Sequence, residues 1–201
     1  MIAVIDYDAG NIFSVKNALD HLGFESVQAC RPDDVVKADK LILPGVGAFP
    51  DAMRSLRERG LADAIVREAK RKPLLGICLG AQLLFEKGYE FAETDGLGLI
   101  PGYVDAIVAP GMKIPHMGWN SVRVTNPSPL TKTVHDGDML YFVHSYKAVT
   151  DERYISLASE YGQPLPALVR GGADGQIYGA QFHPEKSGSV GLGILRGFAE
   201  L

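Results

Sequence analysis

The first half of the chain alternates short apolar runs with segments in which apolar residues recur every three or four positions. The apolar runs predict strands at Ile2–Asp6, Ser26–Ala29, Lys40–Leu43 and Leu74–Ile77. The helical spacing predicts a helix over 12–22 that ends at Gly23, two helical segments around Leu56 and Ile65 separated by Gly60, and a helix over Leu79–Lys87. Strands that alternate with helices favour parallel pairing through right-handed crossovers.

The second half has a different pattern, in which strand-like runs follow one another directly. Strands are predicted at Tyr103–Val108, Ser121–Thr125, Met139–Val143, Ile155–Ser159, Ala167–Arg170 and Ile177–Gln181, and a last helix at about Gly191–Glu200. Turn residues separate these runs, as expected for antiparallel hairpins added to a parallel core. The expected fold is α/β, with a largely parallel central sheet flanked by helices. No repeat or long linker interrupts the chain, so residues 1–201 are predicted to form one domain.

The composition fits an ordinary globular protein. The chain has 201 residues, 46% of them hydrophobic and 22% charged, with a net charge of −4. That charge argues against a nucleic-acid or anionic-membrane surface. The N-terminus lacks the basic start of a signal peptide, and no apolar run approaches the roughly 20 residues of a membrane span. Two cysteines, Cys30 and Cys78, make no disulfide framework, so we expect a reducing, cytoplasmic setting.

A glycine-flanked cysteine stands where the strand predicted over 74–77 meets the next predicted helix. The segment reads Gly76-Ile77-Cys78-Leu79-Gly80, the arrangement of a nucleophile elbow with cysteine in place of serine. The sulfur would stand at the start of the helix, whose dipole favours a thiolate, and the Leu79 N–H would face a developing oxyanion. A buried, unreactive core cysteine is the alternative interpretation.

A histidine two residues before a carboxylate follows the last predicted strand, in the segment Phe182-His183-Pro184-Glu185. Extended backbone puts residues i and i+2 on the same side, so Glu185 can orient His183 as a base. Pro184 biases His183 away from helical backbone. Alone, this segment is more simply a surface turn; combined with Cys78 it predicts a Cys-His-Glu triad.

Two further segments are candidates for function. Pro44-Gly45-Val46-Gly47 follows an apolar strand, and its glycines let the Val46 peptide point an N–H into a cleft as a second oxyanion donor; the alternative is an ordinary strand-to-helix turn. Pro115-His116-Met117-Gly118-Trp119-Asn120 contains the only tryptophan. An exposed tryptophan would anchor a protein interface, although composition alone favours a core position. No set of His, Cys and carboxylate residues has metal-ligand spacing, so no metal is predicted.

The chain resembles a known family in these segments. Gly76-Ile77-Cys78-Leu79-Gly80-Ala81-Gln82 and Gln181-Phe182-His183-Pro184-Glu185 are similar, in order and separation, to the signature of class I glutamine amidotransferases. Within that class, four segments resemble the glutaminase subunits of imidazole glycerol phosphate synthases: 44–47, 115–120, 141–146 and 183–187. The resemblance implies a flavodoxin-like fold, glutamine as substrate, no cofactor, and a heterodimer with a (β/α)8-barrel cyclase subunit that acts in histidine biosynthesis.

The resemblance also implies roles for individual residues. Cys78 matches the nucleophile, His183 the base and Glu185 its orienting acid, while Val46 and Leu79 match the oxyanion amides. The positions that match glutamine-binding residues are Gly47, Gln82, His144, Ser145 and Tyr146, and those that match partner-binding residues are Asn11, Trp119 and Lys186. Ala81 departs from the methionine expected in many relatives, which bears on local packing rather than on the chemistry.

Two other functions stay open at this point. One is a glutaminase subunit that serves another pathway, such as pyridoxal phosphate or anthranilate synthesis; the segments 44–47 and 115–120 argue against it. The other is a non-enzymatic redox or binding module built on the same fold, which glutamine turnover with a cyclase subunit would exclude.

Overall fold

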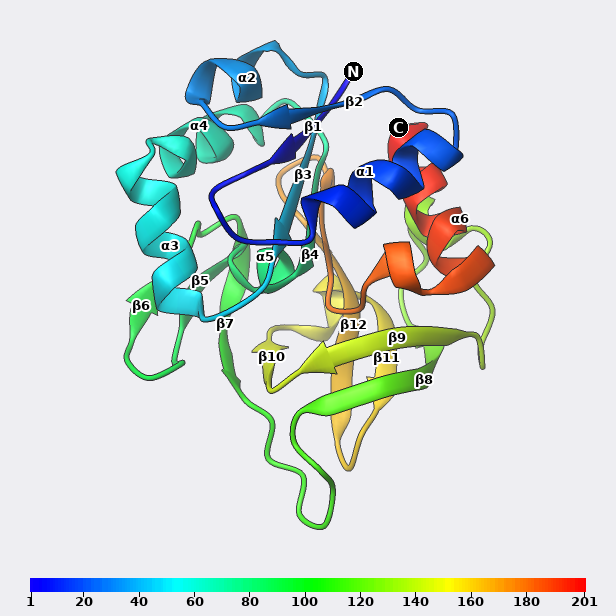
Figure 1. Cartoon of the computed structure of the whole chain (residues 1–201). Coiled ribbons are helices and arrows are strands. Elements are labelled where there is room, and N and C mark those ends of the chain that lie inside the picture. The colour runs from blue at the N-terminus through cyan, green and yellow to red at the C-terminus, as the bar shows by residue number, and fades with distance from the viewer.

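A computed structural model describes all 201 residues of the chain (Figure 1). The strands of the large sheet are β1 (Ile2–Ile5), β2 (Ser26–Ala29), β3 (Lys40–Gly45), β4 (Leu74–Cys78), β8 (His116–Val124), β9 (Met139–His144), β11 (Ile155–Glu160), β12 (Pro164–Gly171) and β13 (Ile177–Ala180). The small sheet contains β5 (Phe85–Gly88), β6 (Thr94–Asp95), β7 (Ile100–Ala106) and β10 (Tyr146–Val149). The helices are α1 (Ile12–His21), α2 (Pro32–Lys37), α3 (Phe49–Glu58), α4 (Leu61–Glu68), α5 (Leu79–Gln82) and α6 (Gly188–Ala199), and the 3-10 turns are η1 (Pro129–Thr131), η2 (Glu152–Tyr154) and η3 (Pro184–Lys186).

The large sheet is parallel in one half and antiparallel in the other. Its strand order is β2-β1-β3-β4-β13-β12-β11-β8-β9, with parallel pairing from β2 to β13 and antiparallel pairing beyond β13. The α/β fold with added antiparallel strands is therefore confirmed, and the antiparallel part is as extensive as the parallel one. The order 2-1-3-4 places a topological switch point between β1 and β3, where open α/β sheets place their sites.

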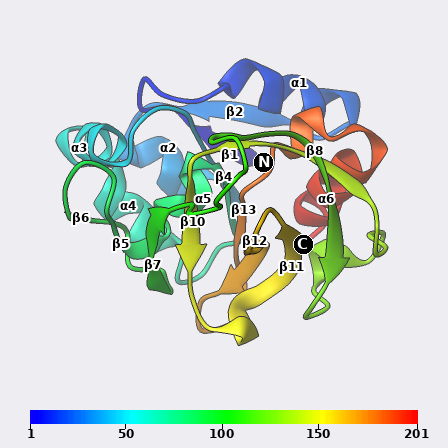
Figure 2. The same ribbon diagram turned by 90° about the horizontal axis from the view of Figure 1, so that it is seen from below.

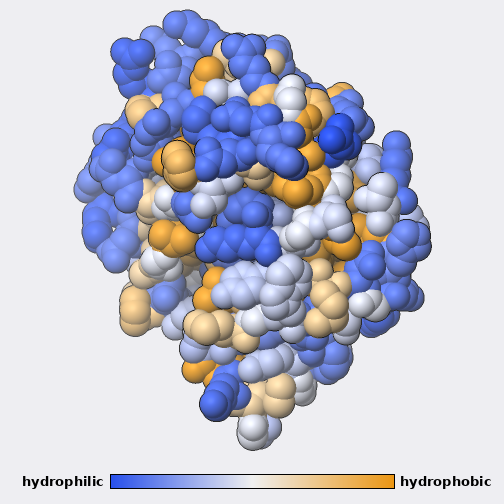
Figure 3. Space-filling view, turned by 45° about the vertical axis from the view of Figure 1, so that its right-hand side comes forward, coloured by the Kyte–Doolittle hydropathy of each residue, from blue (hydrophilic) through white to orange (hydrophobic).

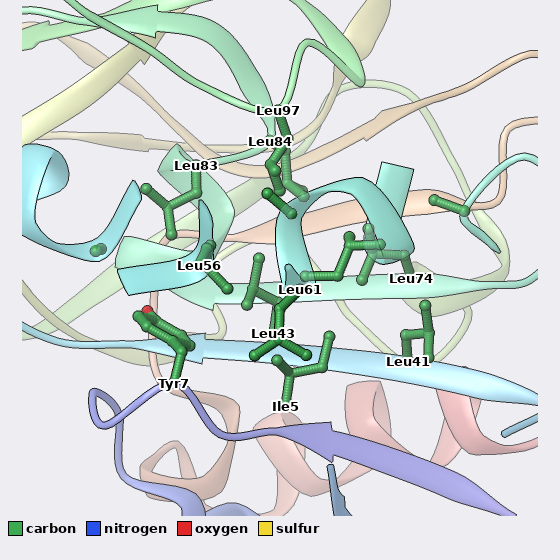
Figure 4. Packing of buried hydrophobic residues seen from close by; sticks show 14 of the residues in the cluster. Ile5, Tyr7, Leu41, Leu43, Leu56, Leu61, Leu74, Leu83, Leu84 and Leu97 are labelled. Carbon is green, nitrogen blue, oxygen red and sulfur yellow. The ribbon is translucent and has the colours of Figure 1, made fainter. Parts of the chain in front are cut away.

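Helices cover both faces of the parallel half. Figure 2 shows α1 and α6 on one side of the sheet and α2, α3 and α4 on the other. The buried apolar residues form two large clusters that correspond to these two faces. Figure 4 shows part of the first cluster, in which Leu56 and Leu61 of the helical layer pack against Ile5, Leu41 and Leu43 of the sheet. No helix is both long and apolar enough to cross a membrane.

The helix predicted over Leu79–Lys87 is wrong beyond its first turn. The helix α5 ends at Gln82, and the chain enters β5 at Phe85. The reason is the segment 96–100, which supplies backbone partners in place of a continued helix: the Leu83 carbonyl accepts from Leu97 N–H at 2.9 Å, and the Leu84 carbonyl accepts from Leu99 and Ile100 N–H at 2.8 and 3.0 Å. An apolar run of this kind suits either a helix or a buried strand, and here long-range pairing decides.

Other predicted boundaries are largely confirmed, with extensions. Gly23 follows α1 with a φ of 83°, and Gly60 separates α3 from α4 with a φ of 67°, the conformations expected of glycine after a helix. The strands β7, β8 and β12 begin before their predicted positions, so the segment 115–120 lies mostly within β8. The short elements α2, β6 and β10 were missed, because each is too short to show a periodic pattern.

Candidate active site

Cys78 lies at the carboxyl end of β4 in a strained backbone conformation. Its φ is 56° and its ψ −112°, values that a residue with a side chain rarely adopts. This conformation turns the chain sharply from β4 into α5 and places the sulfur at the carboxyl end of β4. Cys78 is 7% exposed, and its sulfur lies 3.8 Å from the Val143 carbonyl oxygen. Because α5 has only four residues, its dipole is smaller than the predicted helix would have supplied.

Three glycines permit this turn because no side chain fits at their positions. A Cβ on Gly80 would lie 1.8 Å from the Leu43 carbonyl oxygen, and a Cβ on Gly76 would lie 2.5 Å from the Gly80 oxygen. A Cβ on Gly45 would lie 2.7 Å from the Gly80 nitrogen. The end of β3 therefore packs directly on the elbow that carries Cys78. Ala81, the departure noted above, is buried within the same close contacts.

Tyr7 supports the same region from the end of β1. Its hydroxyl donates to the Pro44 carbonyl oxygen at 3.0 Å, and its side chain is fully buried. Burial raises the pKa of Tyr7, with the Cys78 sulfur adding to the effect, so the phenol remains a hydrogen-bond donor. The end of β3 that leads into the Val46 loop is thereby fixed on its inner side.

His183 follows β13, and its ring is oriented by Glu185. The Nδ1–H of His183 donates to Glu185 Oε1 at 2.9 Å, and the two side chains are 4% and 1% exposed. The other ring nitrogen, Nε2, is buried without a hydrogen-bond partner. Burial alone would lower the pKa of His183, but the neighbouring Cys78 sulfur and the Glu185 carboxylate outweigh it and raise the pKa to about 9. A charged imidazole beside a thiol favours the thiolate.

Ser187 and Tyr141 anchor the segment that carries His183. The His183 N–H donates to the Tyr141 carbonyl oxygen at 2.9 Å, and the Tyr141 N–H donates to Ser187 Oγ at 2.9 Å. The Ser187 hydroxyl in turn donates to the His183 carbonyl oxygen at 2.6 Å. This closed ring of three hydrogen bonds fixes the peptide of His183 to β9, a strand far from it in sequence.

A cavity of about 370 Å³ opens over Cys78 and His183, a size suited to a small-molecule site. Its lining residues are Val46, Gly47, Cys78, Leu79, Gln82, Glu90, Pro115, Val143, His144, Ser145, Tyr146 and His183. All predicted oxyanion and glutamine-binding residues thus lie in one wall or another of this cavity. A larger cavity of about 700 Å³ lies around Arg123 and Lys147, but neither cysteine nor histidine lines it. We therefore place the candidate active site at Cys78.

The predicted oxyanion and substrate residues differ in how firmly they are held. Val46 is 47% exposed at the cavity mouth, and Gly47 follows it with a φ of 96° in open space. Gln82 is buried and fixed, since its Nε2 donates to the Tyr146 carbonyl oxygen and to Gln181 Oε1, each at 3.0 Å. The cavity therefore combines one rigid wall with one exposed loop. The roles of these residues stay predictions.

Glu90 is a cavity residue that the sequence did not reveal. It follows β5, and its Oε2 accepts from the Phe49 N–H at 2.7 Å, at the first residue of α3. Among the cavity-lining side chains it is the single carboxylate. No motif surrounds it, and its position depends on the strand that replaced the predicted helix.

The three residues predicted to bind a partner lie on neighbouring elements. Trp119 is 53% exposed on β8, so the core position favoured by composition is wrong. Lys186 is exposed on η3, which packs against both β9 and α1. Asn11 caps α1, accepting from the Ser14 N–H at 3.3 Å. Figure 3 shows apolar residues scattered in small patches among hydrophilic ones over the face in view. Partner binding by these residues stays a prediction.

No group of three or more His, Cys, Asp or Glu side chains in the structure could hold a metal ion. A buried thiol, a charged imidazole and an orienting carboxylate converge at one end of a small-molecule cavity, an arrangement suited to nucleophilic acyl transfer.

Comparison with known proteins connects this geometry to a family. The family model described as glutamine amidotransferase class-I matches residues 3–199. A curated relative from Listeria monocytogenes serotype 4a, named imidazole glycerol phosphate synthase subunit HisH, is 48% identical over 100% of this chain and 96% of its own length. A relative of the same name from Streptococcus mutans is 51% identical over 100% of this chain and 99% of its own.

Solved structures share the fold at lower sequence identity. A glutamine amidotransferase crystal structure superposes with a TM-score of 0.77 at 21% identity, covering 100% of this chain and 98% of its own. The structure of PurLQS from Thermotoga maritima gives a TM-score of 0.76 at 23% identity, covering 99% of this chain and 97% of its own. At these identities the likeness shows the fold alone.

Proposed function

The chain belongs to the class I glutamine amidotransferase family, and on that premise we propose that it is the glutaminase subunit of an imidazole glycerol phosphate synthase. All 201 residues would then form one glutaminase domain that converts glutamine to glutamate and ammonia. The observation that carries the proposal is the convergence of Cys78, His183 and Glu185, with Nδ1 of His183 2.9 Å from the carboxylate.

The reaction begins with attack by Cys78 on the side-chain amide of glutamine. The raised pKa of about 9 keeps His183 protonated at neutral pH, which stabilises the thiolate that attacks. The resulting tetrahedral intermediate carries an oxyanion, for which the Leu79 and Val46 N–H groups are the proposed donors. His183 then donates its proton to the departing nitrogen, leaving a glutamyl thioester, and water activated by His183 hydrolyses this thioester to glutamate.

The remainder of the cavity suits the amino-acid end of glutamine. Glu90 uses one carboxylate oxygen to accept from the Phe49 N–H, and its charge is available to pair with the α-ammonium group of the substrate. Gln82 and the backbone of 144–146 line the opposite part of the cavity. We assign Glu90 to substrate binding alongside the residues predicted from the sequence.

The ammonia must reach an acceptor before it is protonated. We propose that the partner is a (β/α)8-barrel cyclase subunit, bound over Asn11, Trp119 and Lys186, which uses the ammonia in histidine biosynthesis to form imidazole glycerol phosphate and an aminoimidazole carboxamide ribonucleotide. A cytoplasmic location suits a reaction that depends on a free thiol, and both cysteines are free in the structure.

The test is the Cys78→Ala variant in complex with a cyclase subunit. Because Cys78 supplies the nucleophile, glutamine-driven synthesis should fall by several orders of magnitude, whereas synthesis driven by added ammonia should be unchanged. Cys30→Ala is the matched control, since Cys30 is exposed and lies outside the cavity, and it should retain both activities. Glutamine-driven turnover above about one thousandth of wild type in Cys78→Ala would exclude this function.

A further inference from the structure

Two buried histidines face each other across the β8–β9 pair, beside the active site. The antiparallel register places His116 directly opposite His144, and side chains at opposed positions lie on the same face of a sheet. The two residues are 2% and 6% exposed. His144 lines the cavity, whereas His116 lies behind it and has no role in the proposed reaction.

The hydrogen bonds of these histidines define a single direction of donation. The Tyr146 carbonyl oxygen can only accept, so His144 Nδ1, at 2.8 Å from it, is the donor. His144 Nε2 then accepts from His116 Nδ1 at 3.0 Å. His116 Nε2 in turn accepts from the Asn120 side-chain amide at 3.2 Å. Asn120 Nδ2 also donates to the Glu160 carbonyl oxygen at 2.8 Å, which fixes the orientation of its amide.

This order of donors and acceptors requires both rings to be neutral. A second proton on either Nε2 would place a hydrogen against another donor. The surroundings of His116 also favour a neutral ring, because two aromatic rings flank it. The ring centroids of Phe142 and Tyr161 lie 4.8 and 4.1 Å from that of His116. Burial lowers the pKa of His144 to about 4 and also lowers the pKa of His116.

The chain of hydrogen bonds ends at the point where the polypeptide passes between the two sheets. β9 ends at His144 in the large sheet, β10 begins at Tyr146 in the small sheet, and Ser145 alone connects them. The Tyr146 carbonyl oxygen accepts from Gln82 as well as from His144, so two side chains fix one peptide. This crossing forms a wall of the cavity.

We propose that Asn120, His116 and His144 form a neutral hydrogen-bond relay that positions the Ser145–Tyr146 backbone for binding of glutamine. Asn120 and His116 are thus positioning residues that act through His144 without touching the substrate. The relay starts next to Trp119 and ends in the substrate cavity. This inference rests on the proposed glutaminase function, because the substrate that the wall binds is the glutamine of that reaction.

The test compares His116→Leu with His116→Asn in the complex with the cyclase subunit. Leucine and asparagine have nearly the same shape, so both leave the same space beside Phe142, but only asparagine can donate from the position of Nδ1 to His144 Nε2. His116→Leu should raise the KM for glutamine about tenfold, the effect of one lost hydrogen bond, with kcat within about twofold. His116→Asn should retain a KM within about twofold of wild type.

A second readout separates positioning from damage to the catalytic pair. In a Cys30→Ser background Cys78 is the remaining thiol, and its alkylation by iodoacetamide should proceed at the same rate in wild type and His116→Leu. If His116→Leu does not fold, Asn120→Leu removes the donor to His116 Nε2 and should raise KM in the same direction.

Three results would overturn the relay: equal KM increases in His116→Leu and His116→Asn, an unchanged KM in both, or slower alkylation together with a reduced kcat. The wild-type complex distinguishes this proposal from the function on which it rests. If wild type hydrolyses glutamine and the two variants behave alike, only the relay fails. If the wild-type complex hydrolyses no glutamine, the glutaminase function itself fails.

Discussion

Ser187 illustrates how a residue outside the reaction determines the geometry of one inside it. Its hydroxyl joins the His183 carbonyl to the Tyr141 N–H, and the side chain is 1% exposed. Removing the hydroxyl leaves a buried N–H and a buried carbonyl without this partner, at a cost of about 1–2 kcal/mol. It also releases one of the connections that hold His183 against β9.

We predict that Ser187→Ala lowers kcat for glutamine hydrolysis by about tenfold or more, because the imidazole loses its fixed position relative to the thiol. The KM for glutamine should change less, since Ser187 does not line the cavity. Steady-state glutaminase assays of the complex, with melting temperatures, provide the measurement. Ser189→Ala is the control, since Ser189 is exposed two residues away; a variant of Ser187 with unaltered kcat would contradict the prediction.

The residues predicted from the sequence and those missed differ in how local their signals are. Cys78 and His183 stand in short contiguous motifs at strand ends, and their backbone requirements are set by adjacent glycine and proline. Glu90 has no adjacent glycine or proline, and Gly188 beside Ser187 gives no indication of the role of the Ser187 hydroxyl. Glu90 reaches the cavity through β5, and Ser187 matters because of a bond to β9, so both depend on contacts between segments distant in sequence.

For the helices and strands, the apolar pattern predicted which elements exist, and of which type, better than it predicted their lengths. Most strands of the parallel half were found because they are buried runs, as for β1 and β4; β2, in which only Ala29 is buried, is the exception. The segment after Cys78 failed because its leucines satisfy helical spacing while its carbonyls pair with residues 97–100. The local pattern contains no information on that pairing, because the residues that donate to these carbonyls lie more than ten positions further along the chain.

The loop between β3 and α3 is the exposed wall of the cavity and carries the second predicted oxyanion donor. We predict that Val46→Pro removes this N–H and lowers glutamine-driven synthesis by about 10²–10³-fold, the effect of losing one oxyanion donor. Val46→Ala keeps the N–H and should remain near wild type. The measurement is the ratio of glutamine-driven to ammonia-driven synthesis in the complex; an equal fall in both rates would indicate a folding defect instead.

The end of α4 is tied to α2 through a buried carboxylate. Glu68 is 1% exposed and pairs with Arg67 at 3.3 Å, Arg71 at 2.6 Å and Lys72 at 2.9 Å, and Lys72 also donates to the Val36 carbonyl oxygen at 2.6 Å. Hydrogen bonds from Lys72 and then Arg71 lower the pKa of Glu68 to about 2, against the opposing effect of burial. A carboxyl whose pKa is lowered by folding stabilises the fold at pH values above its unfolded pKa.

We predict that Glu68→Gln lowers the free energy of unfolding at pH 7 by about 1–2 kcal/mol, a moderate value because Arg67 and Arg71 are largely exposed. The difference from wild type should narrow as the pH falls from about 4.5 towards 2, where the native carboxylate becomes protonated. Urea unfolding across this pH range measures it, with Glu58→Gln at the exposed end of α3 as control. If the difference in unfolding free energy between Glu68→Gln and wild type did not depend on pH, the ion pairs of Glu68 would not be its cause.

For the molecule as a whole, the residues of the predicted partner surface come from β8, α1 and η3, and η3 packs against α1 and against β9, the neighbour of β8. Trp119, on β8, lies 6.0 Å from the Tyr141 ring of β9, measured between ring centroids, and Tyr141 is tied to the segment that carries Lys186. Phe13 on α1 is a further exposed aromatic residue, at 75% exposure. Exposed aromatic residues among polar ones are typical of anchors at protein interfaces.

We predict that Trp119→Ala weakens association with the cyclase subunit by about 2 kcal/mol or more, because the indole is a large exposed anchor whose removal costs little in the free chain. Titration calorimetry with the purified cyclase subunit measures the affinity, and a thermal melt of the isolated chain checks its fold. Val36→Ala truncates an exposed apolar residue on α2 and should leave affinity unchanged. Unaltered affinity with a large fall in melting temperature would place Trp119 among the core residues instead.

The position of β13 has a consequence for the protein as it is synthesised. β13 is the last strand in the chain, yet it lies between β4 and β12 and joins the parallel half of the sheet to the antiparallel half. Until residues 177–185 have been synthesised, the strand that bears Cys78 has one unpaired edge, and neither His183 nor Glu185 is beside it. Because His183 and Glu185 follow β13, the predicted triad is complete only after this final strand has been inserted between β4 and β12.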